Sequence, residues 1–169
     1  MPRYPDSENR DPLTGAATEP ALLRFTKAVL DLADPQSLPV GFLLIDIDGL
    51  REIVACFGAE AGDAVLLGVA DRLQEDVRGH DLVGRVAAGF GICMPDLLPA
   101  QARGAAERLR RRLGEAPLPT PAGNLGITCS IGLALGNDPG LGPVELMTRA
   151  QLALQEAQQA GGNRVVTAG

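Results

Sequence analysis

The chain has 169 residues and a formal net charge of −6, and 46% of its residues are hydrophobic although only 3% are aromatic. This length fits one domain with its own core. An acidic chain without tryptophan lacks the positive charge and the stacking surfaces that nucleic acid needs, so we exclude nucleic acid as a partner. No window reaches the roughly 20 apolar residues of a membrane span, and three cysteines without metal-ligand spacing favour reduced thiols. We therefore expect a cytoplasmic protein with no membrane contact.

The first half of the chain predicts helices around one buried strand. Residues 1–10 are polar and proline-containing, which predicts a flexible lead followed by a single domain over residues 11–169. Apolar residues at helical spacing predict a helix over 19–34. The nearly continuous apolar run over 40–47 predicts a strand buried on both faces. Two further helices are predicted over 50–57 and 61–77.

The second half of the chain alternates strands and helices. Its predicted elements are a hairpin of strands over 82–86 and 92–94 with Gly89 between them, a helix over 100–113, an irregular proline-rich loop over 117–123, a strand over 125–135 with one buried face, a helix over 144–160 and a strand over 164–166. This order predicts an α/β sandwich, in which a mixed sheet is flanked by helices.

Two carboxylates follow the predicted buried strand. Asp46 and Asp48 at the end of that strand are typical of a cation site. The hairpin turn over 85–92 is where a further acid is expected, but it carries none and contains Ala87, Ala88, Gly89 and Phe90 in sequence. The acidic side chain expected to contribute to the cation site is therefore missing from this turn.

Five short motifs occur in order along nearly the whole domain. They are DPLTG at 11–15, LIDID at 44–48, GDAVL at 62–66, SIG at 130–132 and AQQAGGNR at 157–164. Together they resemble the GGDEF domain of bacterial diguanylate cyclases, which make cyclic di-GMP from two GTP molecules. The resemblance implies a palm-like fold related to nucleotide cyclases, with a central mixed sheet of about five strands.

The departures from this family fall on its chemistry. The resemblance implies that the hairpin turn should read GG(D/E)EF, with its first acid completing the metal site. Here the turn is one residue shorter and has neither acid, so Asp46 alone should hold magnesium poorly. We therefore expect no metal or other cofactor, and a vestigial active site made of Asp46, Asp63, Ala87, Ala88, Gly89 and Phe90.

Other positions that contact GTP in the family also differ. Val54 replaces the usual guanine-reading Asn, although Asp63 still matches the second guanine contact. Gln158 and Gly162 replace a phosphate-binding Lys and Arg. Because each charged hydrogen bond is worth about 1.5–3 kcal/mol, these losses argue against productive GTP binding.

One ligand motif of the family is retained. Arg78 and Asp81 match RxxD, which in the family forms an inhibitory site for cyclic di-GMP, and Arg108 matches its second arginine. Arginine can pair with a phosphate, and a carboxylate can accept from the N–H groups of guanine. The same residues also fit an ordinary turn after a helix, and the sequence assigns no role to His80 within the motif.

These residues predict a catalytically inactive GGDEF-like signalling domain. It would bind cyclic di-GMP at Arg78, Asp81 and Arg108 and transmit the signal to an unidentified protein effector. A nucleotide-independent interaction scaffold is one alternative. Residual metal-dependent nucleotide cyclase activity through Asp46 and Asp63 is another, and a homodimer bridged by the ligand is compatible with the retained site.

Overall fold

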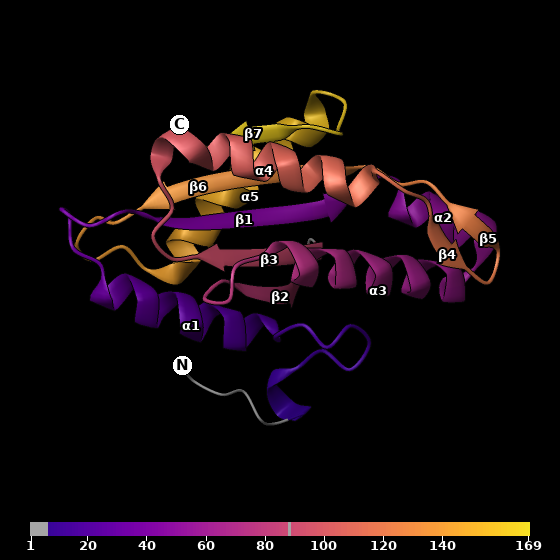
Figure 1. Cartoon of the computed structure of the whole chain (residues 1–169), viewed down its shortest axis with the longest axis horizontal. Coiled ribbons are helices and arrows are strands. Elements are labelled where there is room, and N and C mark those ends of the chain that lie inside the picture. Colours follow the sequence, from indigo (N-terminus) through magenta and orange to yellow (C-terminus); the bar gives the residue numbers. More distant parts are fainter. Residues whose placement is uncertain (1–6, 88) are drawn as a thin grey trace.

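The chain is built around one mixed five-stranded sheet. The computed structural model describes residues 7–87 and 89–169 (Figure 1). The strands stand in the order β2-β3-β1-β6-β7, and all neighbours are antiparallel except β6 and β7. Their bounds are β1 Val40–Ile47, β2 Leu82–Val86, β3 Gly89–Met94, β6 Cys129–Gly136 and β7 Val165–Thr167. The predicted mixed sheet is confirmed.

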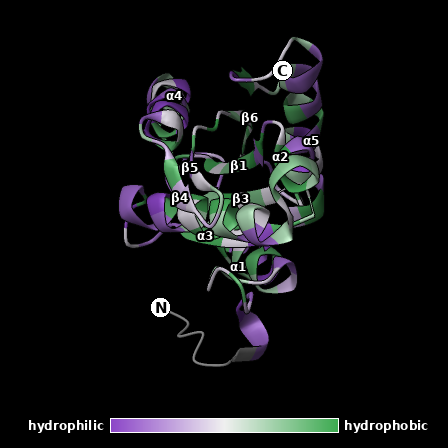
Figure 2. Cartoon of the chain, turned by 90° about the vertical axis from the view of Figure 1, so that its right-hand side faces the viewer, coloured by the Kyte–Doolittle hydropathy of each residue, from purple (hydrophilic) through white to green (hydrophobic). Residues whose placement is uncertain are grey.

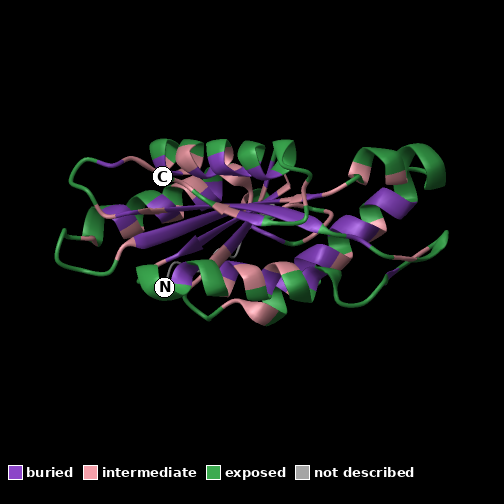
Figure 3. Cartoon of the chain, turned by 90° about the horizontal axis from the view of Figure 1, so that it is seen from above, coloured by how far each residue is buried: buried purple, intermediate pink, exposed green. Residues whose placement is uncertain are grey.

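Within residues 7–87 and 89–169, five α-helices accompany the sheet, and four of them form two layers. The helices are α1 Glu19–Leu32, α2 Leu50–Phe57, α3 Ala59–Asp76, α4 Pro99–Gly114 and α5 Pro143–Gln159. One apolar cluster joins α3 and α4 to the sheet, and a second joins α1 and α5 to the opposite face. Figure 2 shows α4 and α5 on opposite sides of the strands, and Figure 3 shows buried strands between helices with exposed outer faces.

The central strands are buried on both faces. This was predicted for β1, but β6 was predicted to have only one buried face, and that prediction is wrong. The alternating Ile127, Cys129, Ile131 and Leu133 suggested a half-exposed strand, yet Ser130 between them and Ala134 after them are also fully buried. The reason is that α5 covers the second face at close range: a Cβ added at Gly132 would collide with the backbone of α5. The glycine of the SIG motif permits this approach.

Several strand boundaries differ from the prediction. β6 begins at Cys129 rather than at residue 125. β3 begins at Gly89 rather than near residue 92, so the hairpin turn is short and Val86 pairs with Gly89. The proline-rich segment predicted to be irregular contains a small hairpin of β4 Leu118–Thr120 and β5 Gly123–Leu125. Its two-stranded sheet consists only of edge strands, where proline is tolerated.

The start of the domain is anchored to strand β2. Residues 7–9 form a short 3-10 helix, Ser7–Asn9, and Arg10 bridges to Ala17, so the part of the predicted flexible lead within the described residues is ordered. Residues 1–6 lie outside the described part. The DPLTG turn is closed by Asp11, whose carboxylate accepts from the backbone and hydroxyl of Thr14. Arg85 on β2 donates to the same carboxylate and thereby joins this turn to the sheet.

None of the helices in the described part of the chain combines the length and the apolar character needed to cross a membrane.

Candidate functional site

The first candidate site lies at the hairpin end of the sheet. Ile45 on β1 pairs with Phe90 on β3, so Asp46 lies beside Gly89 and the turn that precedes it. A cavity of about 580 Å³ opens here between β1, α2 and the β2–β3 hairpin. Its lining includes the predicted residues Asp46, Ala87 and Gly89, together with Val54 and Arg85.

Asp46 is half-buried, and its carboxylate contacts the last helix. The side-chain amide of Gln158 on α5 donates a hydrogen bond to its carboxylate. Burial raises the pKa of the Asp46 carboxyl above its ordinary value, and the neighbouring Asp48 raises this pKa further. An uncharged amide therefore occupies the position where the family resemblance implied a phosphate-binding lysine.

The second carboxylate of the LIDID motif has a structural role. Asp48 accepts hydrogen bonds from the hydroxyls of Thr128 and Ser130, both at 2.7 Å, and from the backbone N–H of Asn163 at 2.9 Å. These contacts hold the loop between α5 and β7 against the end of β1. The oxygens of Asp48 are thus already used by three protein donors.

The backbone at Gly89 leaves no space for a side chain. Its φ is +141°, a conformation that L side chains rarely adopt, and a Cβ added there would collide with the carbonyl oxygen of Ile45. An acid at this position therefore requires the hairpin to move away from β1. Among the described residues that line this cavity, the carboxylates are those of Asp46 and Glu52, and the hairpin contributes none.

The other predicted residues of this site are not all brought together. Asp63 is exposed on α3 and does not line the cavity. Phe90 is fully buried in the core, its ring centroid lies 6.0 Å from the guanidinium of Arg85, and it does not line the cavity. Ala88 lies outside the described residues. The sequence missed this packing because the resemblance placed Phe90 within a functional motif.

A second cavity of about 580 Å³ lies between the C-terminal end of α3 and helix α4. All three residues predicted to bind the ligand, Arg78, Asp81 and Arg108, line it. Arg78 and Asp81 come from the α3–β2 turn, whereas Arg108 projects from α4. The fold therefore brings Arg108 to the same cavity as Asp81, which lies 27 positions earlier in the sequence.

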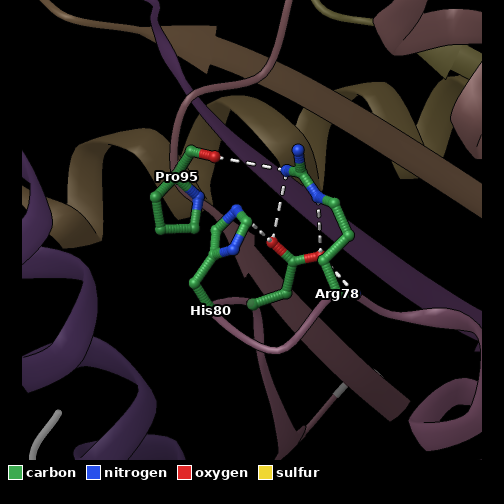
Figure 4. A network of polar contacts seen from close by, with 4 residues as sticks. Arg78, His80 and Pro95 are labelled. Atoms are coloured by element: carbon green, nitrogen blue, oxygen red, sulfur yellow. Dashed lines mark hydrogen bonds and ion pairs between the residues drawn. The ribbon is translucent and has the colours of Figure 1, made fainter.

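Arg78 and Asp81 form a close pair within this cavity (Figure 4). The Nε and Nη2 groups of Arg78 donate to the two Asp81 carboxylate oxygens at 3.4 and 3.3 Å, and its backbone N–H donates at 3.0 Å. The Asp81 side chain is only 1% exposed, whereas that of Arg78 is 48% exposed. The guanidinium thus has one edge on a buried carboxylate and its remaining donors near the cavity.

Some residues of this second cavity were not predicted from the sequence. The carbonyl of Pro95 accepts from Arg78 at 3.2 Å, Met94 and Leu97 supply apolar lining, and Gln101 adds an amide. No motif marks them, because they come from the β3–α4 connection and the start of α4. His80 was given no role, yet its Nε2 atom lies 4.0 Å from the Asp81 carboxylate.

A mixed five-stranded sheet between two helical layers, with a cavity at its hairpin end, defines a palm-type α/β domain. Residues 8–164 match the family model described as "Diguanylate cyclase, GGDEF domain", and the chain belongs to the GGDEF family. The resemblance inferred from the five motifs is confirmed.

Similar proteins agree with this assignment. The response regulator PleD of Caulobacter vibrioides is 38% identical over 131 residues, which are 76% of this chain and 29% of PleD. The probable diguanylate cyclase DgcT of Escherichia coli is 29% identical over 161 residues, which are 94% of this chain and 35% of DgcT. The chain thus spans about a third of the length of these relatives.

The solved structures share the fold over nearly the whole chain. The GGDEF domain of DgcB from Caulobacter crescentus, crystallised in complex with cyclic di-GMP, superposes with a TM-score of 0.88 at 23% identity and covers 99% of this chain and 96% of that one. Diguanylate cyclase SiaD of Pseudomonas aeruginosa, in complex with its activator SiaC, gives a TM-score of 0.87 at 25% identity over 94% of this chain and 61% of SiaD. The predicted palm-like fold is confirmed.

Proposed function

We propose that this GGDEF domain has lost cyclase activity and acts as a cyclic di-GMP receptor. The single observation that carries the proposal is the cavity that collects Arg78, Asp81 and Arg108. Two arginines can oppose the two phosphates of the ligand, and Asp81 can accept from the N–H groups of a guanine. The crystallised complex of the DgcB domain with cyclic di-GMP supports a ligand of this kind on this fold.

The charge around the cavity favours an anionic ligand despite the net charge of −6. Helix α4 carries five arginines and a single acid, Glu107. Arg108 takes part in none of the ion pairs formed among the described residues. Its guanidinium is therefore available to a phosphate without breaking an internal contact.

The geometry of the other cavity supports the proposed loss of catalysis. Asp46 is held by Gln158, Asp48 is used by three donors, and Gly89 has no space for an acid. Magnesium in a cyclase must bind both the protein and the phosphates of GTP. We infer that this site does not hold the metal in a productive geometry, and no cofactor is needed for the receptor role.

Calorimetry tests the receptor proposal directly. Cyclic di-GMP is titrated into the wild type, Arg78→Ala and Arg51→Ala, because Arg51 is an exposed arginine that lines only the hairpin cavity. We expect binding by the wild type, a loss of about tenfold to 100-fold in Arg78→Ala, and wild-type affinity in Arg51→Ala. The proposal is wrong if the wild type gives no heat at about 100 μM ligand, or if Arg78→Ala binds as tightly as the wild type.

Residual cyclase activity is tested separately. The protein is incubated with GTP and magnesium, and the products are separated by chromatography. We expect no cyclic di-GMP and no other nucleotide product. Product formation that disappears in Asp46→Ala would overturn the loss of catalysis.

A protein effector is part of the proposal, because a receptor must pass on its signal. The structure of SiaD with its activator SiaC supports protein contacts for this family. Here α2 is an apolar helix without a single buried residue, and Val54 and Phe57 on it are 40% and 49% exposed. This exposed surface also favours the second candidate function, a nucleotide-independent interaction scaffold.

Partner capture and molar mass distinguish these roles. For a receptor, we expect the set of captured partners or the molar mass in light scattering to change when cyclic di-GMP is added. A homodimer bridged by the ligand would double the mass only in its presence. Identical capture with and without nucleotide, combined with silent calorimetry, would favour the scaffold.

A further inference from the structure

His80 occupies a specific place beside the retained motif. It is the only histidine in the chain, and it lies in the turn between α3 and β2. Its Nε2 atom is 4.0 Å from Oδ1 of Asp81, the same oxygen that accepts from Nη2 of Arg78. Figure 4 shows the imidazole and the guanidinium approaching this carboxylate from two sides.

The Arg78–Asp81 pair creates a conflict for ligand binding. Asp81 is 1% exposed, and the Arg78 side chain donates to both of its oxygens. If Arg78 turns toward a phosphate, it withdraws donors from a buried carboxylate. A buried charge that loses its partner is strongly unfavourable. A second cation beside Asp81 would remove this penalty.

We propose that protonated His80 is a positioning residue that takes over Oδ1 of Asp81 from Nη2 of Arg78, which releases Nη2 for cyclic di-GMP and leaves Oδ2 of Asp81 to accept from a guanine. This inference rests on the proposed receptor function. Histidine is the side chain whose charge normally changes between pH 5 and 8. The positive imidazolium also adds attraction for a dianionic ligand. Cyclic di-GMP therefore binds more tightly at about pH 6 than at about pH 8.

The other charged groups around this turn are carboxylates and guanidinium groups. Asp76 at the end of α3 is held by Arg112 at 2.6 Å. Asp96 follows Pro95 in the β3–α4 connection, and Arg108 lines the cavity from α4. Carboxylates and guanidinium groups do not ordinarily titrate near neutrality.

A thiol also lies near the motif. Cys93 on β3 is fully buried next to strand β2, and burial raises the pKa of its thiol to about 12. The thiol therefore remains neutral between pH 6 and 8. Of the residue types around the Arg78–Asp81 pair, histidine is the one that ordinarily changes its charge in this range.

The direction of the effect follows from linkage. If the complex favours protonated His80, ligand binding raises the pKa of the imidazole, and the affinity falls as the pH rises through the range in which free His80 loses its proton. Exposed charge pairs are weak, so we expect the dissociation constant to rise by about threefold to tenfold between pH 6 and 8.

Calorimetry over this pH range uses two matched variants. His80→Gln removes the titrating group and keeps a polar side chain, so we expect weak, pH-independent binding. His80→Lys supplies a permanent cation, so we expect tight binding that is also pH-independent. A wild-type affinity that does not change with pH, or a pH dependence that persists in His80→Gln, would overturn the inference.

Nuclear magnetic resonance provides a readout that a merely structural role would not move. Because the chain has one histidine, its imidazole C–H signal is unambiguous and reports the pKa of His80 directly. We expect a higher pKa in the saturated complex than in the free protein. An unchanged pKa with normal ligand binding sinks this inference and leaves the receptor function standing, whereas an absence of binding at every pH removes both.

Discussion

The two cavities of this domain have the same volume, about 580 Å³ each, but opposite chemistry. At the hairpin end, Asp46 and Asp48 are hydrogen bonded to the protein itself, and the turn presents Ala87 and a glycine. Between α3 and α4, Arg108 has no internal ion pair among the described residues and Arg78 is about half exposed. The difference shows that a cavity predicts ligand binding only when its charged groups remain available.

The comparison also separates two kinds of constraint at the hairpin cavity. Val54 lines the cavity with its side chain, so it can be exchanged without moving the backbone. At Gly89 the backbone itself lies against the carbonyl of Ile45, so a side chain there requires the hairpin to move. Under the proposed loss of catalysis, restoring an acid at Gly89 therefore also requires a change in the hairpin backbone.

The largest effect is expected when an acid is restored at the hairpin. Gly89→Glu should lower the free energy of unfolding by about 3 kcal/mol, because the new Cβ meets the β1 backbone and φ lies in the left-handed region. Ala87→Glu adds the same acid at an exposed position of the same turn and should change the free energy of unfolding by less than about 1 kcal/mol. Urea denaturation measures both. Equal stabilities, or cyclic di-GMP synthesis by Gly89→Glu, would contradict this account.

A somewhat smaller loss of stability is expected at the second cavity. Asp81→Asn replaces the buried carboxylate that accepts three hydrogen bonds from Arg78 and should cost about 1–3 kcal/mol of unfolding free energy. It should also weaken cyclic di-GMP binding by tenfold or more, about 1.4 kcal/mol. Asp71→Asn, on the exposed surface of α3, is the control for both measurements. If Asp81→Asn matches the wild type in both stability and affinity, Asp81 supports neither the fold nor the ligand site.

The contribution of helix α4 is expected to be smaller again. Arg108→Ala should weaken ligand binding by about threefold to tenfold without changing stability, because this side chain is exposed and makes no internal ion pair among the described residues. Arg103→Ala removes an arginine of the same helix that does not line the cavity and should leave the affinity unchanged. Equal effects of the two variants in calorimetry would indicate general attraction rather than a site.

The smallest effect concerns the pH dependence of stability at the hairpin end. The pKa of Asp46 is raised in the folded state, chiefly by burial, so ionising Asp46 costs stability as the pH rises from the ordinary carboxyl range through the folded pKa. Asp46→Asn retains an oxygen that can accept from Gln158 and should be more stable than the wild type at pH 7 by less than about 1 kcal/mol. The difference should vanish in acid, below the unfolded pKa. A variant that is less stable at pH 7 would indicate that the carboxylate has a favourable partner.

Most of the fold could be predicted from local patterns. The apolar run over 40–47 and the helical spacing in α3 and α5 gave elements close to those observed, since burial imposes these periods on the sequence. The burial of both faces of β6 could not be predicted, because it depends on the close packing of α5 at Gly132. The β4–β5 hairpin was missed because its prolines are acceptable only on the edge strands of a small separate sheet.

By itself, the sequence determined the family and the five-stranded framework, because both follow from residue types at fixed spacing along the chain. It also predicted Arg78, Asp81 and Arg108 as one ligand site, and these residues line one cavity. Only the tertiary structure decided which charges are available. The register of β1 against β3 places the hairpin backbone beside Asp46, and the α3–β2 turn places His80 beside Asp81. Such contacts depend on distances between segments that lie far apart in the sequence or within a folded turn, and residue spacing alone does not specify those distances.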